Sequence, residues 1–343
     1  MSSWAPRASR HLQTYLLGYS LLAIAMGWAL GLALPAPSKA LSAGLSDAVK
    51  VLVFMMIYPM MVNLDLGALP RVVREPRPVL LSVLYNFVLT PIVSVGLVWL
   101  LIHDSQLALG FLLVMLIPGS SMSVGYTGLA EGSLEVATVA LALNFLLVPV
   151  LLPLLLHVLS QAYHVAVPLG ALFESVLLVL ILPIVLAVLT RWAIAWTKGP
   201  QALKSIRPVL GLSTMTTMLT VVGMIFFMKA RLLVSHWTLL IPLLVATVVY
   251  LVVMLPLITW LDRRLGVSYG DHMGIAFLST GKNNGTAIAI AVLAFGPLVA
   301  IPAATLPLFQ IVFLVGYVNL APRVRAYFAR RGAEEPVPGP PAG

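Results

Sequence analysis

The sequence predicts an all-α integral membrane protein. Of its 343 residues, 61% are hydrophobic and 9% are charged, whereas about 25% of the residues in a typical soluble domain are charged. Apolar stretches of roughly 20 residues recur along the chain, and each is long enough to cross a hydrocarbon layer of ~30 Å as a helix. A helix satisfies its own backbone hydrogen bonds in lipid, so helices are the expected spanning form.

Ten segments fit this description, each delimited to within a few residues. They are 13–34, 48–66, 78–102, 107–130, 134–157, 168–195, 207–228, 236–262, 270–296 and 298–321.

The basic residues give the expected orientation. With the N-terminus in the cytoplasm, fifteen Lys and Arg residues fall in cytoplasmic segments and four, Lys39, Lys50, Lys229 and Arg231, fall on the other face. This is the positive-inside bias, and it predicts a multi-pass protein of the plasma (inner) membrane with both termini in the cytoplasm. The net charge of +9 then reflects topology and contact with lipid headgroups, and we expect no nucleic-acid partner.

Several kinds of chemistry are not expected from this chain. It contains no cysteine, so disulfides, thiolate metal sites and thiol chemistry are excluded. Metal-ligand spacings, glycine-rich phosphate loops and nucleophile–His–acid arrangements are not apparent. We therefore expect neither an enzyme nor a bound cofactor or metal.

The ten segments divide into two groups of five that share one feature. The segment 107–130 is interrupted at Pro118-Gly119-Ser120-Ser121, and the segment 270–296 is interrupted at Gly281-Lys282-Asn283-Asn284-Gly285, each after about 11 residues. At ~1.5 Å per residue both breaks lie near the middle of the membrane. Each is the fourth segment of its five, and because five is odd the second copy runs in the opposite sense.

This pattern predicts two inverted five-helix repeats, residues 1–160 and 161–321, followed by a disordered cytoplasmic tail, residues 322–343, rich in Pro and Gly. Paired interrupted helices in inverted repeats indicate the binding site of a secondary transporter. In the alternative interpretation the Gly and Pro residues mark kinks or close helix contacts alone.

Lys282 is a charged residue in the middle of an apolar segment. A lysine at the centre of a membrane helix costs roughly 2.5 to 3.5 kcal/mol on insertion scales, so we expect it to face the protein interior. The alternative is that it extends to a membrane interface. A buried ammonium held by carbonyl ends, Asn283 and Asn284 could bind and release a proton, or act as a fixed counter-charge for an anion.

Unwound helices expose both polarities, with bare carbonyls ending the first half-helix and bare N–H groups starting the second. Polar residues at matching depth complete the predicted substrate and coupling site. Its members are Asn86, Pro118, Gly119, Ser120, Ser121, Ser123, Tyr126, Thr127, Asn144, Ser279, Thr280, Gly281, Lys282, Asn283, Asn284 and Gly285. For the Ser and Thr residues the alternative is a hydrogen bond back to their own helix.

Over nearly its whole length the chain resembles the bile acid:sodium symporter superfamily, which includes the arsenical-resistance permeases. "IYPMMVNLDLGAL", "NFVLTP" and "AIAIAVLAFG" most resemble the arsenite branch; "IPGSSMSVGYTGLAEGS" resembles the bile acid branch, in which a Gly-Met-Gln-Asn-type turn stands where this chain has "GKNNG". The resemblance implies a panel domain, 13–34, 48–66, 168–195 and 207–228, and a core domain of the remaining segments. The two broken helices would cross at their breaks, and the core would move against the panel in alternating access.

The family's ligands match this chain only in part. The resemblance implies that the carboxylate of the first sodium site is replaced by Ser279, and its other ligands by Val124, Ala137 and Leu141. At the second sodium site Asn86 and Asn283 match glutamines of the family, and Lys282 lies between Gly281 and Asn283. An ammonium there repels a sodium ion by several kcal/mol at an intermediate dielectric.

Against the arsenite branch, Gly119 replaces the family's cysteine and Gly285 aligns with its glutamate. Arsenite prefers thiol ligands, which this chain lacks.

The sequence thus predicts a secondary active transporter of a small organic anion, independent of sodium and coupled to protons, with Lys282 in place of sodium. The alternatives are an arsenite or antimonite efflux permease and a sodium-coupled organic anion symporter. Two further classes are a channel, because broken helices also form selectivity filters, and a membrane sensor that uses a transporter fold.

Overall fold

The computed structural model describes residues 4–35, 38–73, 76–161, 169–235 and 237–334. Within them every regular element is a helix, as the composition predicts.

Eight helical stretches of the described residues are long and apolar enough to cross a membrane. Three of them are single helices in the first half of the chain: α2 (Leu16–Ala33), α3 (Lys39–Asn63) and α8 (Leu134–Gln161). Two contain a π-helical turn: α4 (Pro76–Leu84), η2 (Tyr85–Leu89) and α5 (Thr90–Leu101); and α9 (Leu169–Val176), η3 (Leu177–Ile181) and α10 (Leu182–Lys198). The other three are α11 (Pro200–Ser235), α12 (Leu240–Arg264), which η4 (Trp237–Leu239) precedes, and α15 (Ile301–Asn319).

The two π-helical turns have a common cause. Each ends just before a proline in the second position of the next helix, Pro91 in α5 and Pro183 in α10. Proline lacks an N–H group and its ring clashes with the preceding turn, so the helix widens there instead of continuing regularly. The first of these turns places Asn86 in the interior.

The two predicted interruptions are present. Residues 117–120 separate α6 (Ser105–Leu116) from α7 (Ser121–Leu129), and residues 281–283 separate α13 (Tyr269–Thr280) from α14 (Asn284–Ala294). These four helices have 9 to 12 residues each, so each alone is too short to cross a bilayer.

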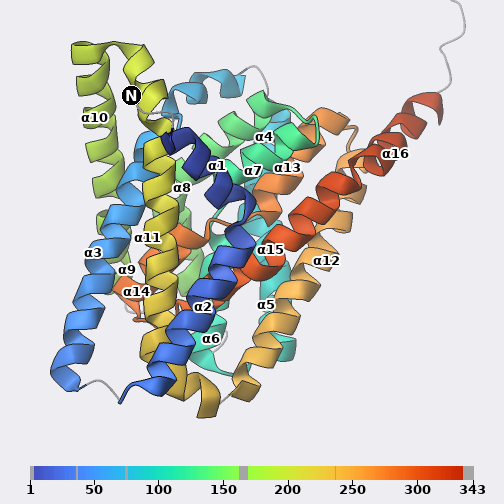
Figure 1. Ribbon diagram of the computed structural model, residues 1–343. Coiled ribbons are helices and arrows are strands. Elements are labelled where there is room, and N and C mark those ends of the chain that lie inside the picture. The colour runs from blue at the N-terminus through green and yellow to red at the C-terminus, as the bar shows by residue number, and fades with distance from the viewer. Residues whose placement is uncertain (1–3, 36–37, 74–75, 162–168, 236, 335–343) are drawn as a thin grey trace, which may run out of the picture.

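The helices pack in two groups (Figure 1). We call α2, α3, α10 and α11 the panel group and α4 to α8 together with α12 to α15 the core group; the two groups also touch, mainly where α3 packs on α14 and α2 on α15. In the panel group α2 and α11 touch through their backbones: a Cβ atom on Gly27 would lie 2.1 Å from the carbonyl oxygen of Gly223, and one on Gly31 would lie 2.4 Å from that of Phe227. This four-residue glycine spacing is typical of closely packed membrane helices.

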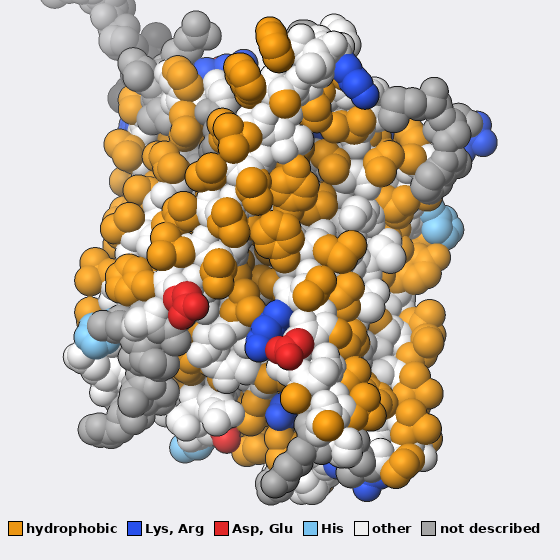
Figure 2. Space-filling model, turned by 90° about the vertical axis from the view of Figure 1, so that its left-hand side faces the viewer, with side chains coloured by type: hydrophobic (Ala, Val, Ile, Leu, Met, Phe, Trp, Pro, Cys, Tyr) orange, Lys and Arg blue, Asp and Glu red, His pale blue; other side chains and the backbone are white. Residues whose placement is uncertain are grey.

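The outer surface suits lipid. Hydrophobic side chains cover most of one lateral face (Figure 2), and large apolar residues such as Trp99, Trp192 and Trp196 are exposed. A soluble monomer does not expose apolar area on this scale. The protein is a multi-pass membrane protein.

Short helices lie at the ends of the bundle. They are α1 (Trp4–Thr14), η1 (Leu66–Val73) and α16 (Ala321–Glu334). The prediction of a disordered tail is wrong for residues 322–334, which form α16; residues 335–343 lie outside the described part of the chain. The apolar residues of α16 explain the helix, because Val324 and Phe328 pack against the core, whereas Pro and Gly are concentrated beyond residue 334.

Candidate functional site

The two interruptions cross each other in the core group. Gly119 and Lys282 form an isolated antiparallel bridge. The N–H of Gly119 donates to the carbonyl of Leu278 at 3.0 Å, and the N–H of Asn283 donates to the carbonyl of Pro118 at 3.0 Å. Backbone groups that unwinding leaves bare are thus satisfied by the opposite interruption.

Gly119 makes this close approach possible. A Cβ atom at this position would lie 2.6 Å from Ser123 Oγ, 2.7 Å from the carbonyl oxygen of Leu278 and 2.8 Å from that of Gly281. Ser123 Oγ itself donates to the Gly281 carbonyl at 3.1 Å. Any larger residue at position 119 would push the interruptions apart.

Both second half-helices begin at the crossing with a capped N-terminus. The side chain of Ser120 accepts from the N–H of Met122 at 3.3 Å, and that of Asn283 accepts from the N–H of Thr286 at 3.1 Å. The N-terminal ends of α7 and α14 therefore direct partial positive charge toward the same region.

Lys282 lies inside the protein, with 1% of its surface exposed. Its Nζ donates to Asn86 Oδ1 at 3.1 Å and lies 5.9 Å from the centre of the Tyr250 ring. Its backbone is held by Gln310, which accepts from the Lys282 N–H at 3.0 Å and donates to the Lys282 carbonyl at 3.2 Å. The alternative of a lysine extended to the interface is wrong.

The ammonium has no carboxylate partner within 4.0 Å among the described residues. A buried cation without a counter-ion is costly, and its polar neighbours or a bound anion must offset that cost.

A short chain of amides extends from Lys282 into the core. Asn86 Nδ2 donates to Asn144 Oδ1 at 3.2 Å, and Asn144 Nδ2 donates to Ser82 Oγ at 2.8 Å. Each amide also donates to a carbonyl of its own helix, Asn86 to Ser82 and Asn144 to Ala140. These contacts orient Asn86 so that its oxygen faces the amine.

Three polar atoms near the crossing are buried and have no hydrogen-bond partner among the described residues. They are Ser279 Oγ, Asn284 Oδ1 and Thr286 Oγ1. Buried polar groups in folded proteins are usually paired, so unpaired ones at one place indicate a position for solute or water.

Three members of the predicted site are occupied elsewhere. Thr127 and Thr280 donate to carbonyls of their own helices, at 2.9 Å and 2.6 Å. The ring of Tyr126 packs against that of Phe277, with 5.8 Å between centroids. The structure brings the remaining predicted residues together around the crossing or in the amide chain behind it.

Two cavities adjoin the crossing. The larger has a volume of about 270 Å³ and is lined by Asn63, Asp65, Ser120, Ser121, Asn283 and Arg207, together with apolar residues. The smaller, of about 90 Å³, is lined by Lys282, Asn284, Gly285 and Gln310 among others. Ser120, Ser121 and Asn283 line both cavities.

Sequence reasoning missed three contributors. Tyr250 and Gln310 lie within long apolar segments, where a search for single polar residues at mid-depth would have found them. Arg207 was assigned to the cytoplasmic surface for topology alone. It lines the larger cavity from α11, opposite the core group.

Comparison with known proteins identifies the family. The model of the sodium bile acid symporter family matches residues 50–236. The chain belongs to this family.

Proteins with related sequences carry several different names. An uncharacterized transporter of Synechocystis sp. is 26% identical over 315 residues, 83% of this chain and 81% of the relative. The uncharacterized sodium-dependent transporter YocS of Bacillus subtilis is 25% identical, over 76% of this chain and 78% of its own. The arsenical-resistance protein Acr3 of Corynebacterium glutamicum is 24% identical over 91% of this chain and 89% of its own. These names indicate a transporter.

Proposed function

We propose that the protein is a secondary active transporter of a small organic anion, independent of sodium and coupled to protons. The observation that supports this most directly is the buried amine of Lys282, bonded to Asn86 and without a carboxylate partner within 4.0 Å among the described residues.

The proposed architecture has ten transmembrane helices. The eight long stretches, α6 with α7, and α13 with α14 make up the ten, arranged as inverted repeats over residues 1–160 and 161–321. The panel group and the core group correspond to the two bodies that would move against each other. Both termini would lie in the cytoplasm, at the plasma membrane, as the distribution of basic residues indicates.

An anionic solute suits the larger cavity. Arg207 contributes a guanidinium, whose planar set of donors matches a carboxylate. Ser120, Ser121 and Asn283 offer polar groups on the opposite wall, and the N-terminal ends of α7 and α14 add partial positive charge. Asp65 also lines this cavity, and Arg191 at 3.5 Å offsets its negative charge.

The residues at the positions of the family's two sodium sites disfavour sodium binding. The positions of the family's first sodium site are Ser279, Val124, Ala137 and Leu141, and Val124 and Leu141 give the cavity an apolar wall instead of ligands. At the position of the family's second sodium site, the ammonium of Lys282 donates a hydrogen bond to Asn86, the residue that would bind the ion. The amine of Lys282, by gaining and losing a proton, would take over the part of the coupling ion.

Arsenite efflux is the second candidate, favoured by the relative named Acr3. The chain has no cysteine, so such a site would have to use oxygen ligands. The relative named as sodium-dependent makes sodium-coupled anion transport the third.

One series of experiments separates the three. The purified full-length protein is screened by thermal shift against acetate, lactate, pyruvate, succinate, citrate and arsenite. Counterflow of the most stabilising compound is then measured in proteoliposomes in sodium or potassium buffer, at several pH values. Stabilisation and counterflow by a carboxylate in potassium buffer are expected. Strict dependence on sodium, or stabilisation by arsenite alone, would replace the proposal with the corresponding alternative.

A further inference from the structure

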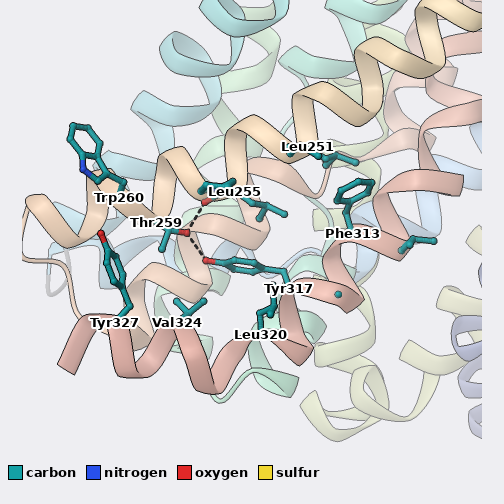
Figure 3. A pocket seen from close by; sticks show the side chains of 13 residues that line it. Leu251, Leu255, Thr259, Trp260, Phe313, Tyr317, Leu320, Val324 and Tyr327 are labelled. Carbon is teal, nitrogen blue, oxygen red and sulfur yellow. Dashed lines mark hydrogen bonds between the residues drawn. The ribbon is translucent and has the colours of Figure 1, made fainter. Parts of the chain in front are cut away.

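A large apolar groove lies between α12, α15 and α16, apart from the crossing (Figure 3). Its volume is about 720 Å³, and its apolar lining includes Leu251, Leu255, Phe313, Leu320 and Val324. The groove opens on the outer surface, because Val252, Trp260 and Val312 also line it and are exposed. In a membrane protein such an opening faces the hydrocarbon chains of the lipid.

The polar groups in the wall of the groove are bonded within the protein. Thr259 Oγ1 donates to the carbonyl of Leu255 at 2.6 Å and lies 2.7 Å from Tyr317 Oη (Figure 3). Tyr317 Oη also lies 2.7 Å from His272 Nε2. Among the described residues, none that lines the groove is acidic. The wall therefore suits a hydrocarbon chain better than a polar solute.

The groove has the depth of one lipid leaflet. Along α12 its lining runs from Leu251 to Trp260, which at ~1.5 Å per residue is a rise of ~14 Å, close to half of a ~30 Å hydrocarbon layer. Trp260 and Tyr327 lie together at one end of the groove (Figure 3). Trp and Tyr side chains are enriched at the level of the headgroups, so this end is expected at the membrane surface.

Two guanidinium groups lie at the same end. Cζ of Arg263 is 4.1 Å from the centre of the Tyr327 ring, and Cζ of Arg264 is 5.4 Å from the centre of the Trp260 ring. Both arginines belong to the last turn of α12. The planar donors of a guanidinium match the oxygens of a phosphate group.

Nearby acidic residues leave this positive charge in place. The carboxylate of Asp262 is fully buried and lies 2.7 Å from Nδ1 of His272. The carboxylate of Glu131 lies 2.6 Å from Arg325 of α16. Within the described part of the chain Arg264 has no salt bridge within 4.0 Å, and its side chain is exposed. The end of the groove therefore attracts an anion.

We propose that the groove binds one anionic phospholipid of the surrounding bilayer. An acyl chain would lie along α12 between α15 and α16, and the phosphate would accept hydrogen bonds from Arg263 and Arg264. Phosphatidylcholine has the same phosphate, but its choline cation cancels the charge. The net negative charge of phosphatidylglycerol is retained, so basic residues at the membrane surface favour it. The inference goes beyond the proposed function and does not rest on it.

A second copy of the chain suits the groove less well. Two copies that meet through the same surface in one membrane are related by a two-fold axis along the membrane normal. The basic ends of their grooves would then lie at the same height. Arg264 of each copy would face that of the other, and like charges repel.

Native mass spectrometry of the delipidated full-length protein tests the proposal. The protein in detergent is mixed with equal amounts of dioleoyl phosphatidylglycerol and dioleoyl phosphatidylcholine, which differ only in the headgroup. We expect one molecule of phosphatidylglycerol to bind roughly tenfold more tightly than phosphatidylcholine, because two basic residues contribute to the difference.

The double variant Arg263→Gln/Arg264→Gln tests the headgroup contact. It should bind the two lipids equally. The control is Arg71→Gln/Lys198→Gln, which removes the same charge from exposed residues of η1 and α10 outside the groove and should keep the preference. Should the arginine double variant fail to fold, Arg264→Gln alone, which changes an exposed side chain, should still reduce the preference.

Gly316→Leu tests the position of the acyl chain. Gly316 lines the groove, and a Cβ atom there would have nothing within 4 Å in the described structure. Leucine can therefore fill the groove without displacing other residues, and it favours the helix more than glycine does. The variant should fold and bind little of either lipid. Gly96→Leu on α5 is the control, because its Cβ position is equally open and lies outside the groove.

Three results would overturn the proposal. The first is equal binding of the two lipids by the wild type, and the second is an unchanged preference in the arginine variants. The third is a wild-type dimer that Gly316→Leu converts to a monomer, which would assign the groove to a second copy. No solute is present in these measurements, so their failure leaves the transport proposal intact, and absence of transport leaves this one intact.

Discussion

Nζ of Lys282 donates to Oδ1 of Asn86 across 3.1 Å, although the two residues lie 196 positions apart in the chain. One comes from the second interrupted segment and the other from a π-helical turn in the first half. Asn144 and the carbonyl of Ser82 orient the amide of Asn86. The contact therefore joins the two halves of the protein at Lys282. Among the described residues, Lys282 carries the one deeply buried ammonium.

Lys282→Met should fold and lose transport. A buried charge that has no carboxylate partner among the described residues costs stability, so we expect its replacement by an apolar side chain to leave the thermal unfolding temperature the same or to raise it. Uptake into proteoliposomes should fall to background. The control is Lys50→Met, which changes an exposed lysine on α3. Full uptake by Lys282→Met, at every pH tested, would remove the amine from the mechanism.

The same variant should gain a response to sodium. In the bile acid branch that this chain resembles, a Met precedes the Gln of the Gly-Met-Gln-Asn-type turn. Lys282→Met restores that pattern beside Asn86 and Asn283. Sodium should raise the unfolding temperature of the variant, compared with potassium at equal concentration, and have no effect on the wild type. Stabilisation of the wild type by sodium would contradict the assignment of Lys282.

Asn86→Leu should destabilise the protein while Lys282 is present. The ammonium would lose Oδ1 of Asn86 as its hydrogen-bond acceptor, and hydrogen bonds to charged groups contribute about 1.5 to 3 kcal/mol. We expect chemical denaturation to detect a loss of this size. In the double variant Asn86→Leu/Lys282→Met the loss should be smaller, because the unpaired charge is gone. Equal losses in both backgrounds would mean that Asn86 acts independently of Lys282.

Gly119→Ala should disrupt the crossing. The new Cβ would lie within 2.8 Å of two backbone oxygens and the hydroxyl of Ser123, so the interruptions must separate. We expect loss of transport and a lower unfolding temperature. Gly125→Ala is the matched control, because nothing lies within 4 Å of that Cβ position, and alanine favours the helix by up to about 1 kcal/mol. Similar behaviour of the two variants would show that the crossing tolerates separation.

Arg207→Gln should weaken solute binding without affecting the fold. Arg207 is exposed and lines the larger cavity, and loss of a charge-assisted hydrogen bond of about 1.5 to 3 kcal/mol reduces affinity roughly tenfold to hundredfold. Titration with the carboxylate that most stabilises the wild type measures the change. Arg323→Gln, on the surface of α16, is the control; an unchanged affinity in Arg207→Gln would place the solute elsewhere.

The sequence identified the interruptions because they violate a simple pattern. Polar and flexible residues such as Lys282 and Gly119 are conspicuous within long apolar segments, and the cost of burying them points to a special environment. Asn86 and Asn144 were recognisable in the same way, since each is a single amide at mid-depth.

Other features depend on contacts that a linear pattern does not contain. Asp262 and His272 lie near helix ends, where charged residues are ordinary, and they become a buried pair only because α12 and α13 fold back on each other. The helix α16 follows a terminal membrane segment and contains many charges, so its few apolar contacts with the core were not apparent. The sequence pattern indicates only a topological role for Arg207, because Arg207 and Asn283 line the same cavity only once α11 packs beside the core.

The backbone bridge between Gly119 and Lys282 has a mechanical consequence. Since each interruption supplies hydrogen-bond partners for the other, a shift of α6 and α7 past α13 and α14 would leave peptide groups unpaired. Under the proposed transport function, a solute bound at this junction would move together with all four half-helices, and the boundary with α2, α3, α10 and α11 would be the surface along which they slide.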